Sequence, residues 1–346
     1  MPNKKYELTN DTKEFNGITC YRIIALRDIT TIRGIVTKGT IGGYVQSEKN
    51  LSQSGESWIA DNAMVVGNAT VLCSAFIYGK ACISDSACIT GSAIVRDNAC
   101  VSGDAYITDS VTVNESAHIT DSARIKGSVF IRDRVYIGGS AYITDSAQIF
   151  QSARIEGSAS IHGSAVIMEN ALIDGEAIVG SSAFVSGNVH ITDSADIIGS
   201  ASIINSVCIG GSVKIGGTAI VRGLANISGK VFIRGDTVIE DDAVITESKD
   251  IINISPFILK HDSLTVFRCR SDSIKVLLCR HDSYMENEFS GALNDLSKYI
   301  ENIRKGNVFN GTLDEFEKYI EELNYAPNYI EKYRAAINFI KITIDG

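Results

Sequence analysis

Proline is scarce in this chain of 346 residues. It contains three prolines, and none of them falls between residues 51 and 248. A long stretch without proline leaves every backbone N–H free to pair, as strands require. Pro256 follows just beyond this stretch, so we expect the regular structure to end near it.

Long apolar runs and a cleavable leader are also lacking. No stretch is apolar enough to span a bilayer, and the start, MPNKKYELTN, has no apolar segment after its lysines. We therefore expect neither a membrane span nor a signal peptide. Eight cysteines at irregular spacing fit a reducing compartment better than a disulfide framework. A cytoplasmic protein is the resulting expectation.

Basic residues are few in the long central part of the chain. Residues 51–248 hold 21 acidic and 11 basic residues, a balance of −10, whereas residues 1–50 hold 8 basic and 5 acidic ones. A nucleic-acid-binding stripe of Lys and Arg is absent, so we expect no nucleic-acid partner. An acidic array could itself imitate nucleic acid, but turn chemistry and solubility account better for the acids.

The chain instead contains a repeat of six residues. From Val65 to Ile245, every sixth residue is Ile or Val, over 31 consecutive positions. Two places before each stands Ala or Val, with Thr237 as the one polar exception. At the 31 matching positions from Asp61 to Asp241, Gly or Asp occurs 25 times. An internal repeat of this regularity decides the fold class.

A period of six predicts strands and excludes helices. Six helical steps advance about 240° and leave no single apolar face. In an extended chain, the Ala-x-Ile unit places two side chains on one face and one on the other. The Gly or Asp and the Ser or Asn that follow favour turns. Each hexad is therefore a short strand followed by a bend.

Three segments follow from this pattern. Residues 1–50 form a non-repetitive cap with strand-like runs at 21–28 and 34–45, and residues 51–248 form the repeat array. Residues 249–346 form a small α+β tail, in which the runs SLTVFRCR and SIKVLLCR predict a hairpin around residues 271–273.

The tail also predicts helices and a second, smaller repeat. Helical periodicity begins near Glu286, Thr312 to Glu315 is a capping box that opens a helix, and 328–342 reads as another helix with one apolar side. FSGALNDLSKYIE (289–301) and FNGTLDEFEKYIE (309–321) match at seven of thirteen positions. We interpret them as two similar turn-plus-helix units; chance likeness between amphipathic helices is the alternative.

The hexads resemble the repeat of left-handed parallel β-helix proteins. There an aliphatic residue points inward and a small residue follows four places later, as at Ile155 and Ala159 here. The resemblance implies left-handed, triangular coils of three hexads, and therefore an all-β solenoid of about ten coils. It covers residues 57–248.

A closer resemblance begins at the cap. GGYVQSEKNLSQSGESWIADNA is similar to bacterial and phage-borne proteins described as hexapeptide transferases or acetyltransferases, and KYRAAI resembles the C-terminal module of some phage-associated members. The residues that match at the cap are Gly42, Gly43, Ser47, Glu48, Asn50, Leu51, Ser52 and Trp58.

Transferases of this class use a histidine base and a loop extruded from one coil. The base must reach the acceptor hydroxyl or amine. Here no loop interrupts residues 63–248, and His118, His162 and His190 lie inside regular hexads. We therefore expect no enzyme. An acyltransferase that uses acetyl-CoA, with His118 or His190 as its base, is the alternative.

Outward positions eighteen residues apart stack on neighbouring coils. One such column reads Cys82, Cys100, His118, Tyr136, and Cys and His are zinc ligands. Flat parallel strands hold such side chains side by side, so we expect neither a metal site nor a Cys82–Cys100 disulfide. The mixed columns also lack the Thr ladders of an ice-binding surface.

A third outward column is apolar and carries no charge, unlike the other two. Left in water, it would expose a continuous apolar stripe, which soluble monomers seldom tolerate. We expect it to be covered by another subunit of a homo-oligomer, or alternatively by the C-terminal tail. Its seven strongly apolar members are Phe76, Ile94, Phe130, Val166, Phe184, Ile220 and Val238.

Together these patterns predict a binding or scaffold protein without a cofactor. The phage link, which comes only from the resemblance, implies a host protein as the partner, for example a defence component.

Overall fold

The computed structural model describes residues 4–255, 262–271, 273–280, 307–322 and 327–345. The chain divides into two compact units, residues 1–193 and residues 194–346, and each is described by itself. The helical periodicity expected from Glu286 and the first tail repeat, 289–301, lie outside the described residues.

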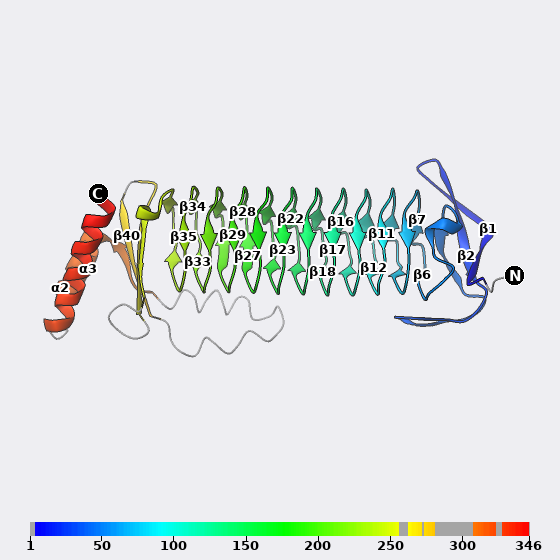
Figure 1. Cartoon of the computed structure of the whole chain (residues 1–346), viewed down its shortest axis with the longest axis horizontal. Helices are drawn as coiled ribbons and strands as arrows, with labels where there is room; N and C mark the ends of the chain where they lie inside the picture. The colour runs from blue at the N-terminus through cyan, green and yellow to red at the C-terminus, as the bar shows by residue number, and fades with distance from the viewer. Residues whose placement is uncertain (1–3, 256–261, 272, 281–306, 323–326, 346) are drawn as a thin grey trace. The chain divides into compact units, whose positions relative to one another are not determined.

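Each hexad forms a short strand and a bend, as the repeat predicts (Figure 1). The coil strands have two residues each, except for Phe184–Gly187 and Ser202–Asn205, which have four. The strands pair in parallel with the strand eighteen residues away, so successive hexads feed three separate sheets. The array is a parallel β-solenoid of about eleven turns, against the ten expected. The left-handed winding stays a prediction.

Three parallel sheets make up the coils of the first unit. The first sheet contains β7 (Met64–Val65), β10 (Cys82–Ile83), β13 (Cys100–Val101), β16 (His118–Ile119), β19 (Tyr136–Ile137), β22 (Arg154–Ile155), β25 (Leu172–Ile173) and β28 (His190–Ile191). The second contains β8 (Thr70–Val71), β11 (Cys88–Ile89), β14 (Tyr106–Ile107), β17 (Arg124–Ile125), β20 (Tyr142–Ile143), β23 (Ser160–Ile161) and β26 (Ile178–Val179). The third contains β6 (Trp58–Ile59), β9 (Phe76–Ile77), β12 (Ile94–Val95), β15 (Thr112–Val113), β18 (Phe130–Ile131), β21 (Gln148–Ile149), β24 (Val166–Ile167) and β27 (Phe184–Gly187).

The second unit continues the same pattern before its tail begins. Its coil strands are β29 (Asp196–Ile197), β30 (Ser202–Asn205), β31 (Cys208–Ile209), β32 (Lys214–Ile215), β33 (Ile220–Val221), β34 (Asn226–Ile227), β35 (Phe232–Ile233), β36 (Val238–Ile239) and β37 (Val244–Ile245). The short 3-10 helix η2 (Ser248–Asp250) ends the coils.

The core of each coil is built from the sixth-residue aliphatics. Ile155 pairs in register with Ile137 on one side and Ile173 on the other, and its side chain is fully buried. The preceding Ala153 is also fully buried. The inward position predicted for the Ile and Val residues is confirmed.

The acidic bends bond one coil to the next. Asp121 has a positive φ of 57°, which Asp tolerates better than most residues. Its Oδ2 accepts a hydrogen bond of 2.7 Å from the backbone N–H of Gly139, eighteen residues on. The pair of Asp145 and Gly163 repeats this bond at 2.9 Å. Many of the acids therefore serve turn chemistry.

An antiparallel sheet caps the first coil. Strands β1 (Tyr6–Phe15), β2 (Ile18–Ala25) and β5 (Ile41–Val45) pair in that order, and β5 then pairs in parallel with β7. Strands β3 (Ile29–Thr31) and β4 (Gly34–Val36) form a separate hairpin. The runs at 21–28 and 34–45 thus do contain strands, whereas β1 was not foreseen.

The cap residues that carry the resemblance pack the cap against the coils. A Cβ on Gly42 would lie 2.6 Å from the carbonyl oxygen of Ile59 and 2.7 Å from Cζ2 of Trp58. The side chain of Asn50, at the end of η1 (Glu48–Asn50), donates hydrogen bonds to the carbonyl oxygens of Gly67 and Ala69. These residues fit the cap against the coils.

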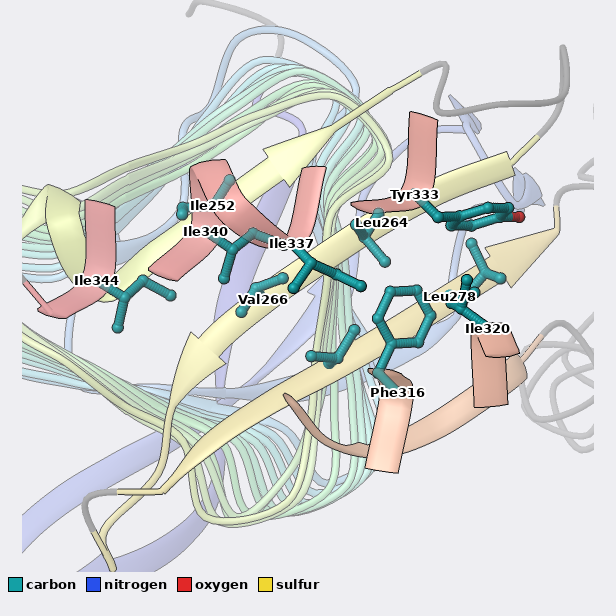
Figure 2. Close-up of a cluster of buried hydrophobic side chains, with 11 residues drawn as sticks. Ile252, Leu264, Val266, Leu278, Phe316, Ile320, Tyr333, Ile337, Ile340 and Ile344 are labelled. Atoms are coloured by element: carbon teal, nitrogen blue, oxygen red, sulfur yellow. The ribbon is translucent and has the colours of Figure 1, made fainter. Parts of the chain in front are cut away.

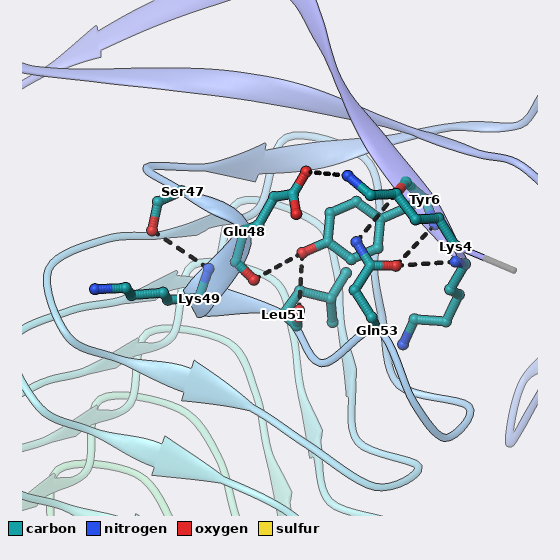
Figure 3. Close-up of polar contacts among 8 residues, drawn as sticks. Lys4, Tyr6, Ser47, Glu48, Lys49, Leu51 and Gln53 are labelled. Atoms are coloured by element: carbon teal, nitrogen blue, oxygen red, sulfur yellow. Dashed lines mark hydrogen bonds and ion pairs between the residues drawn. The ribbon is translucent and has the colours of Figure 1, made fainter. Parts of the chain in front are cut away.

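Polar contacts fix the first strand to the same junction (Figure 3). The hydroxyl of Tyr6 donates to the carbonyl oxygens of Leu51, at 2.8 Å, and Glu48, at 3.1 Å. Gln53 Oε1 accepts a hydrogen bond of 2.9 Å from the backbone N–H of Lys5.

Lys5 is the one fully buried lysine among the described residues. Its Nζ donates to the carbonyl oxygen and to Oγ of Ser57, at 2.8 and 3.1 Å. Burial, with a smaller contribution from Arg27, lowers the pKa of Lys5 from 10.5 to about 8. The charged amine is disfavoured because no carboxylate compensates for its desolvation.

We expect Lys5 to contribute a gain in stability as the pH rises from about 8 to about 10.5. In that window folded Lys5 has released a proton that the unfolded chain still binds, so this group raises the free energy of unfolding with pH, whereas buried thiols with raised pKa values, such as that of Cys82, lower it. Urea denaturation at several pH values measures the sum, and Lys5→Met should make the slope of the free energy of unfolding against pH less positive in this window. An identical slope in Lys5→Met would contradict the assignment.

The tail is a small antiparallel sheet covered by two helices. Strands β38 (Ile251–Ile254), β39 (Asp262–Arg268), β40 (Ile274–Arg280) and β41 (Asn307–Thr312) pair in that order. Helices α2 (Leu313–Glu322) and α3 (Pro327–Asp345) bury Phe316, Tyr333 and Ile340 against the strands (Figure 2). The predicted hairpin is confirmed as β39 and β40.

The capping box is also confirmed. The backbone N–H of Glu315 donates to Oγ1 of Thr312, and the backbone N–H of Thr312 donates to Oε2 of Glu315. The helix expected over 328–342 is part of α3. The repeat unit 309–321 begins in β41, so its first residues are strand rather than the expected turn.

Candidate functional site

The outer surface of the first unit is organised as three columns of in-register side chains. The first runs from Met64 through Cys82, Cys100, His118, Tyr136, Arg154 and Leu172 to His190. The second runs from Thr70 through Cys88, Tyr106, Arg124, Tyr142 and Ser160 to Ile178. The third runs from Trp58 through Phe76, Ile94, Thr112, Phe130, Gln148 and Val166 to Phe184.

The third column is the predicted apolar face. Phe76 and Phe184 are buried, and Ile94, Phe130 and Val166 are half-buried. In the second unit, Ile220 pairs with Val238, which is buried, and Ile220 is half-buried. The register assembles the expected residues, and their role as an interface stays a prediction.

Two aromatic contacts widen this face beyond its mid-strand positions. The ring of Phe150 meets that of Phe130 edge-on at 6.0 Å, and the guanidinium of Arg132 lies 4.7 Å from the centre of the Phe150 ring. The ring of Tyr78 meets that of Phe76 edge-on at 5.6 Å, and Arg33 of the β3–β4 hairpin lies over Tyr78. Phe150 and Tyr78 directly follow an inward Ile, a position outside the mid-strand columns.

The first column brings Cys82, Cys100 and His118 onto neighbouring strands. None of the eight cysteines, all of which lie among the described residues, forms a disulfide. Burial, and to a smaller extent Cys100, raises the pKa of Cys82 to about 11. Burial also raises the pKa of Cys100. The ring of His118 is tilted by 33° against that of Tyr136, its other neighbour, and the ring centres lie 5.6 Å apart.

A convergent zinc cluster is not found there. In the part of the chain that the structure describes, no three His, Cys, Asp or Glu side chains group as metal ligands. Tetrahedral zinc needs ligands that converge on one point. Neighbouring parallel strands instead hold their outward side chains side by side.

The histidines differ in their surroundings. His118 is exposed in mid-strand. The ring of His162 lies directly over Gly180, where an added Cβ would come within 2.0 Å of it. His190 Nε2 lies 3.1 Å from Asp174 Oδ2, within hydrogen-bond distance. A His–carboxylate pair orients an imidazole for proton transfer, and no spacing in the repeat predicted this pair.

An open groove of about 630 Å³ follows one row of bends. A hydrogen bond to Asp133 raises the pKa of Glu115 within it. A sequence pattern marks this groove: Glu115, Gln151 and Glu169 are among the six bend positions that are neither Gly nor Asp. The lining residues are Glu115, Ser116, Asp133, Arg134, Gln151, Ser152, Glu169, Asn170, Gly187 and Asn188.

Comparison with models of known protein families gives no match, and comparison with curated proteins gives none either. Among the helices that the structure describes, none has the length and apolar character needed to cross a bilayer.

Proposed function

We propose that the protein is a non-enzymatic binding scaffold of the hexapeptide-repeat, left-handed β-helix type. One observation supports this above the others. From Met64 to Ile245, a stretch described throughout, every hexad is a strand followed by a bend, and no extruded loop builds a substrate site. Such an array presents long, regular surfaces rather than one concave site.

In this proposal the partner is a protein of the bacterial host, and the scaffold is phage or prophage encoded and acts in the cytoplasm. The phage link is supported by the likeness of the cap and of KYRAAI to phage-borne proteins. The tail supplies partner specificity, because its sheet and helices carry side chains outside the repeat.

A paired capture experiment tests the proposal. The full chain and a chain that lacks residues 261–346 are both used as bait in extracts of the natural host. We expect the full chain to retain a specific protein and the shortened chain, once shown to be folded by circular dichroism, to lose it. Retention by the shortened chain would place specificity in the coils.

We further propose that the third column is the interface of a homo-oligomer. The double variant Phe130→Glu with Phe184→Glu would place charges on the apolar face, and we expect it to sediment as a monomer while the wild type does not. The matched control is Tyr106→Glu with Ile178→Glu, on exposed positions of the second column. A monomeric wild type would contradict the interface.

Acyl transfer from acetyl-CoA is the second candidate, and the pair of His190 and Asp174 is the observation that favours it. There His190 would act as the base toward an acceptor hydroxyl or amine. A thermal shift with acetyl-CoA separates the two functions. The scaffold proposal expects no shift. A shift in the wild type, together with turnover that is abolished in His190→Asn, would establish the transferase.

A further inference from the structure

Soft ligand atoms gather at the cap end of the first column. Met64, Cys82 and Cys100 are consecutive in-register neighbours on β7, β10 and β13. We call these three residues the sulfur row. Met64 is buried and the two cysteines are half-buried. Cys20, from β2, is fully buried and packs in the same cluster as Met64.

The spacing of the row suits a particular coordination geometry. Strands in a parallel sheet lie about 4.8 Å apart, and their outward side chains run parallel. This arrangement cannot surround a tetrahedral ion. A linear ion between two thiolates needs its sulfurs about two metal–sulfur bond lengths apart, and the Zn–S bond of about 2.3 Å sets the scale at roughly 4.6 Å or less. The strand spacing of about 4.8 Å is close to that separation, so the proposal asks only for rotation of the two in-register side chains.

The chemistry of the donor atoms limits further which metal ion can bind here. Thiolate and thioether ligands select Cu(I), Zn²⁺ and iron–sulfur clusters, and the clusters take four thiolates. Zn²⁺ in structural sites takes four ligands, and the described residues hold no group of three His, Cys, Asp or Glu ligands. A two-coordinate ion needs two ligands only.

Side-by-side thiols argue against a tetrahedral site only, so we revise the expectation of no metal on this column and propose that Cys82 and Cys100 together bind one thiophilic, two-coordinate metal ion of the Cu(I) type. Each thiol loses its proton to solvent, two sulfur–copper bonds form, and copper stays in its +1 state. The half-buried position of the two thiols restricts the access of water and competing ligands. This site does not depend on the scaffold function and would stand if that function failed.

The chain supplies its own control. Cys88 occupies the same outward mid-strand position on the second column, and it is half-buried like Cys82. Its in-register neighbours are Thr70 and Tyr106, so no second thiol stands beside it on the sheet. Cys88 therefore has the same backbone setting without the paired donor.

Anaerobic titration of the reduced full chain with Cu(I), against a chromogenic Cu(I) chelator, tests the site. We expect one ion per chain held in competition with the chelator. Cys82→Ser and Cys100→Ser should each weaken binding by more than the roughly 10- to 100-fold that loss of an outer-shell group costs. Cys88→Ser should bind like the wild type.

X-ray absorption of the loaded wild-type protein should find two sulfur neighbours around copper. Circular dichroism and thermal melting of each variant without copper check that the serine substitutions leave the coils folded. Undiminished binding in Cys82→Ser or Cys100→Ser would overturn the proposal, as would a loss in folded Cys88→Ser equal to theirs. A wild-type protein that releases all its Cu(I) to the chelator would also overturn it.

Discussion

Ile155→Asp is expected to lower the free energy of unfolding by several kcal/mol. The side chain is fully buried between Ile137 and Ile173. Loss of one buried Ile side chain removes about 1.5–3 kcal/mol of stabilisation. The new carboxylate would also be desolvated, and no cation points into this part of the coil to compensate it. Urea denaturation followed by circular dichroism measures the change.

The matched control carries the same substitution on the outer surface. Ile178 stands in mid-strand on the second column and is 36% exposed. Ile178→Asp should therefore change the stability little, since its carboxylate keeps its water. Equal losses of unfolding free energy in Ile155→Asp and Ile178→Asp would mean that burial of the inward side chain is not the cause of the loss. Repeat arrays share stability between neighbours, so local opening can precede global unfolding.

Gly43→Ala is expected to destabilise the junction between the cap and the first coil by about 3 kcal/mol. Its new Cβ would lie 2.5 Å from the carbonyl oxygen of Ala63 and 2.6 Å from Cγ2 of Ile59. The same carbonyl of Ala63 accepts the backbone N–H of Tyr44 at 2.8 Å. Relief of the collision would therefore stretch a bond that joins β5 to the coils. Thermal melting and proteolysis of residues 1–50 follow the loss.

Gly216→Ala serves as its control. The nearest atom to a Cβ at Gly216 is a side-chain carbon of Ile198 at 3.5 Å, an ordinary contact distance, and its φ is not positive. We expect this variant to melt close to the wild type. If Gly43→Ala melts no lower than Gly216→Ala, the close packing of the cap is not what excludes a side chain there.

The coils could be predicted from the sequence because one period fixes three things at once. The spacing of Ile155 from Ile137 and Ile173 sets the inward position, the pairing partner and the eighteen-residue turn together. The hairpin of β39 and β40 and the capping box at Thr312 were predictable for another reason, since their signals are local.

Contacts that depend on side-chain direction were not predictable in this way. Asp174 and His190 are sixteen residues apart, off the eighteen-residue column, so their hydrogen bond follows from the way the residue after the inward Ile173 leans toward the next coil. Phe150 joins the apolar face for a similar reason. Strand β38 pairs with β39 beyond the end of the six-residue repeat, so the repeat does not predict this contact.

The assignment of hexads to three sheets restricts how such an array can change in length. Insertion of one hexad after Ile125 would move every later strand to the next sheet. Phe130 would then continue the column of Cys82 and His118, while the inward Ile positions would remain filled. A gain or loss of three hexads keeps every column intact. Lineages of this chain should therefore differ by eighteen residues where their surfaces are kept, and by six or twelve where one face has been exchanged for another.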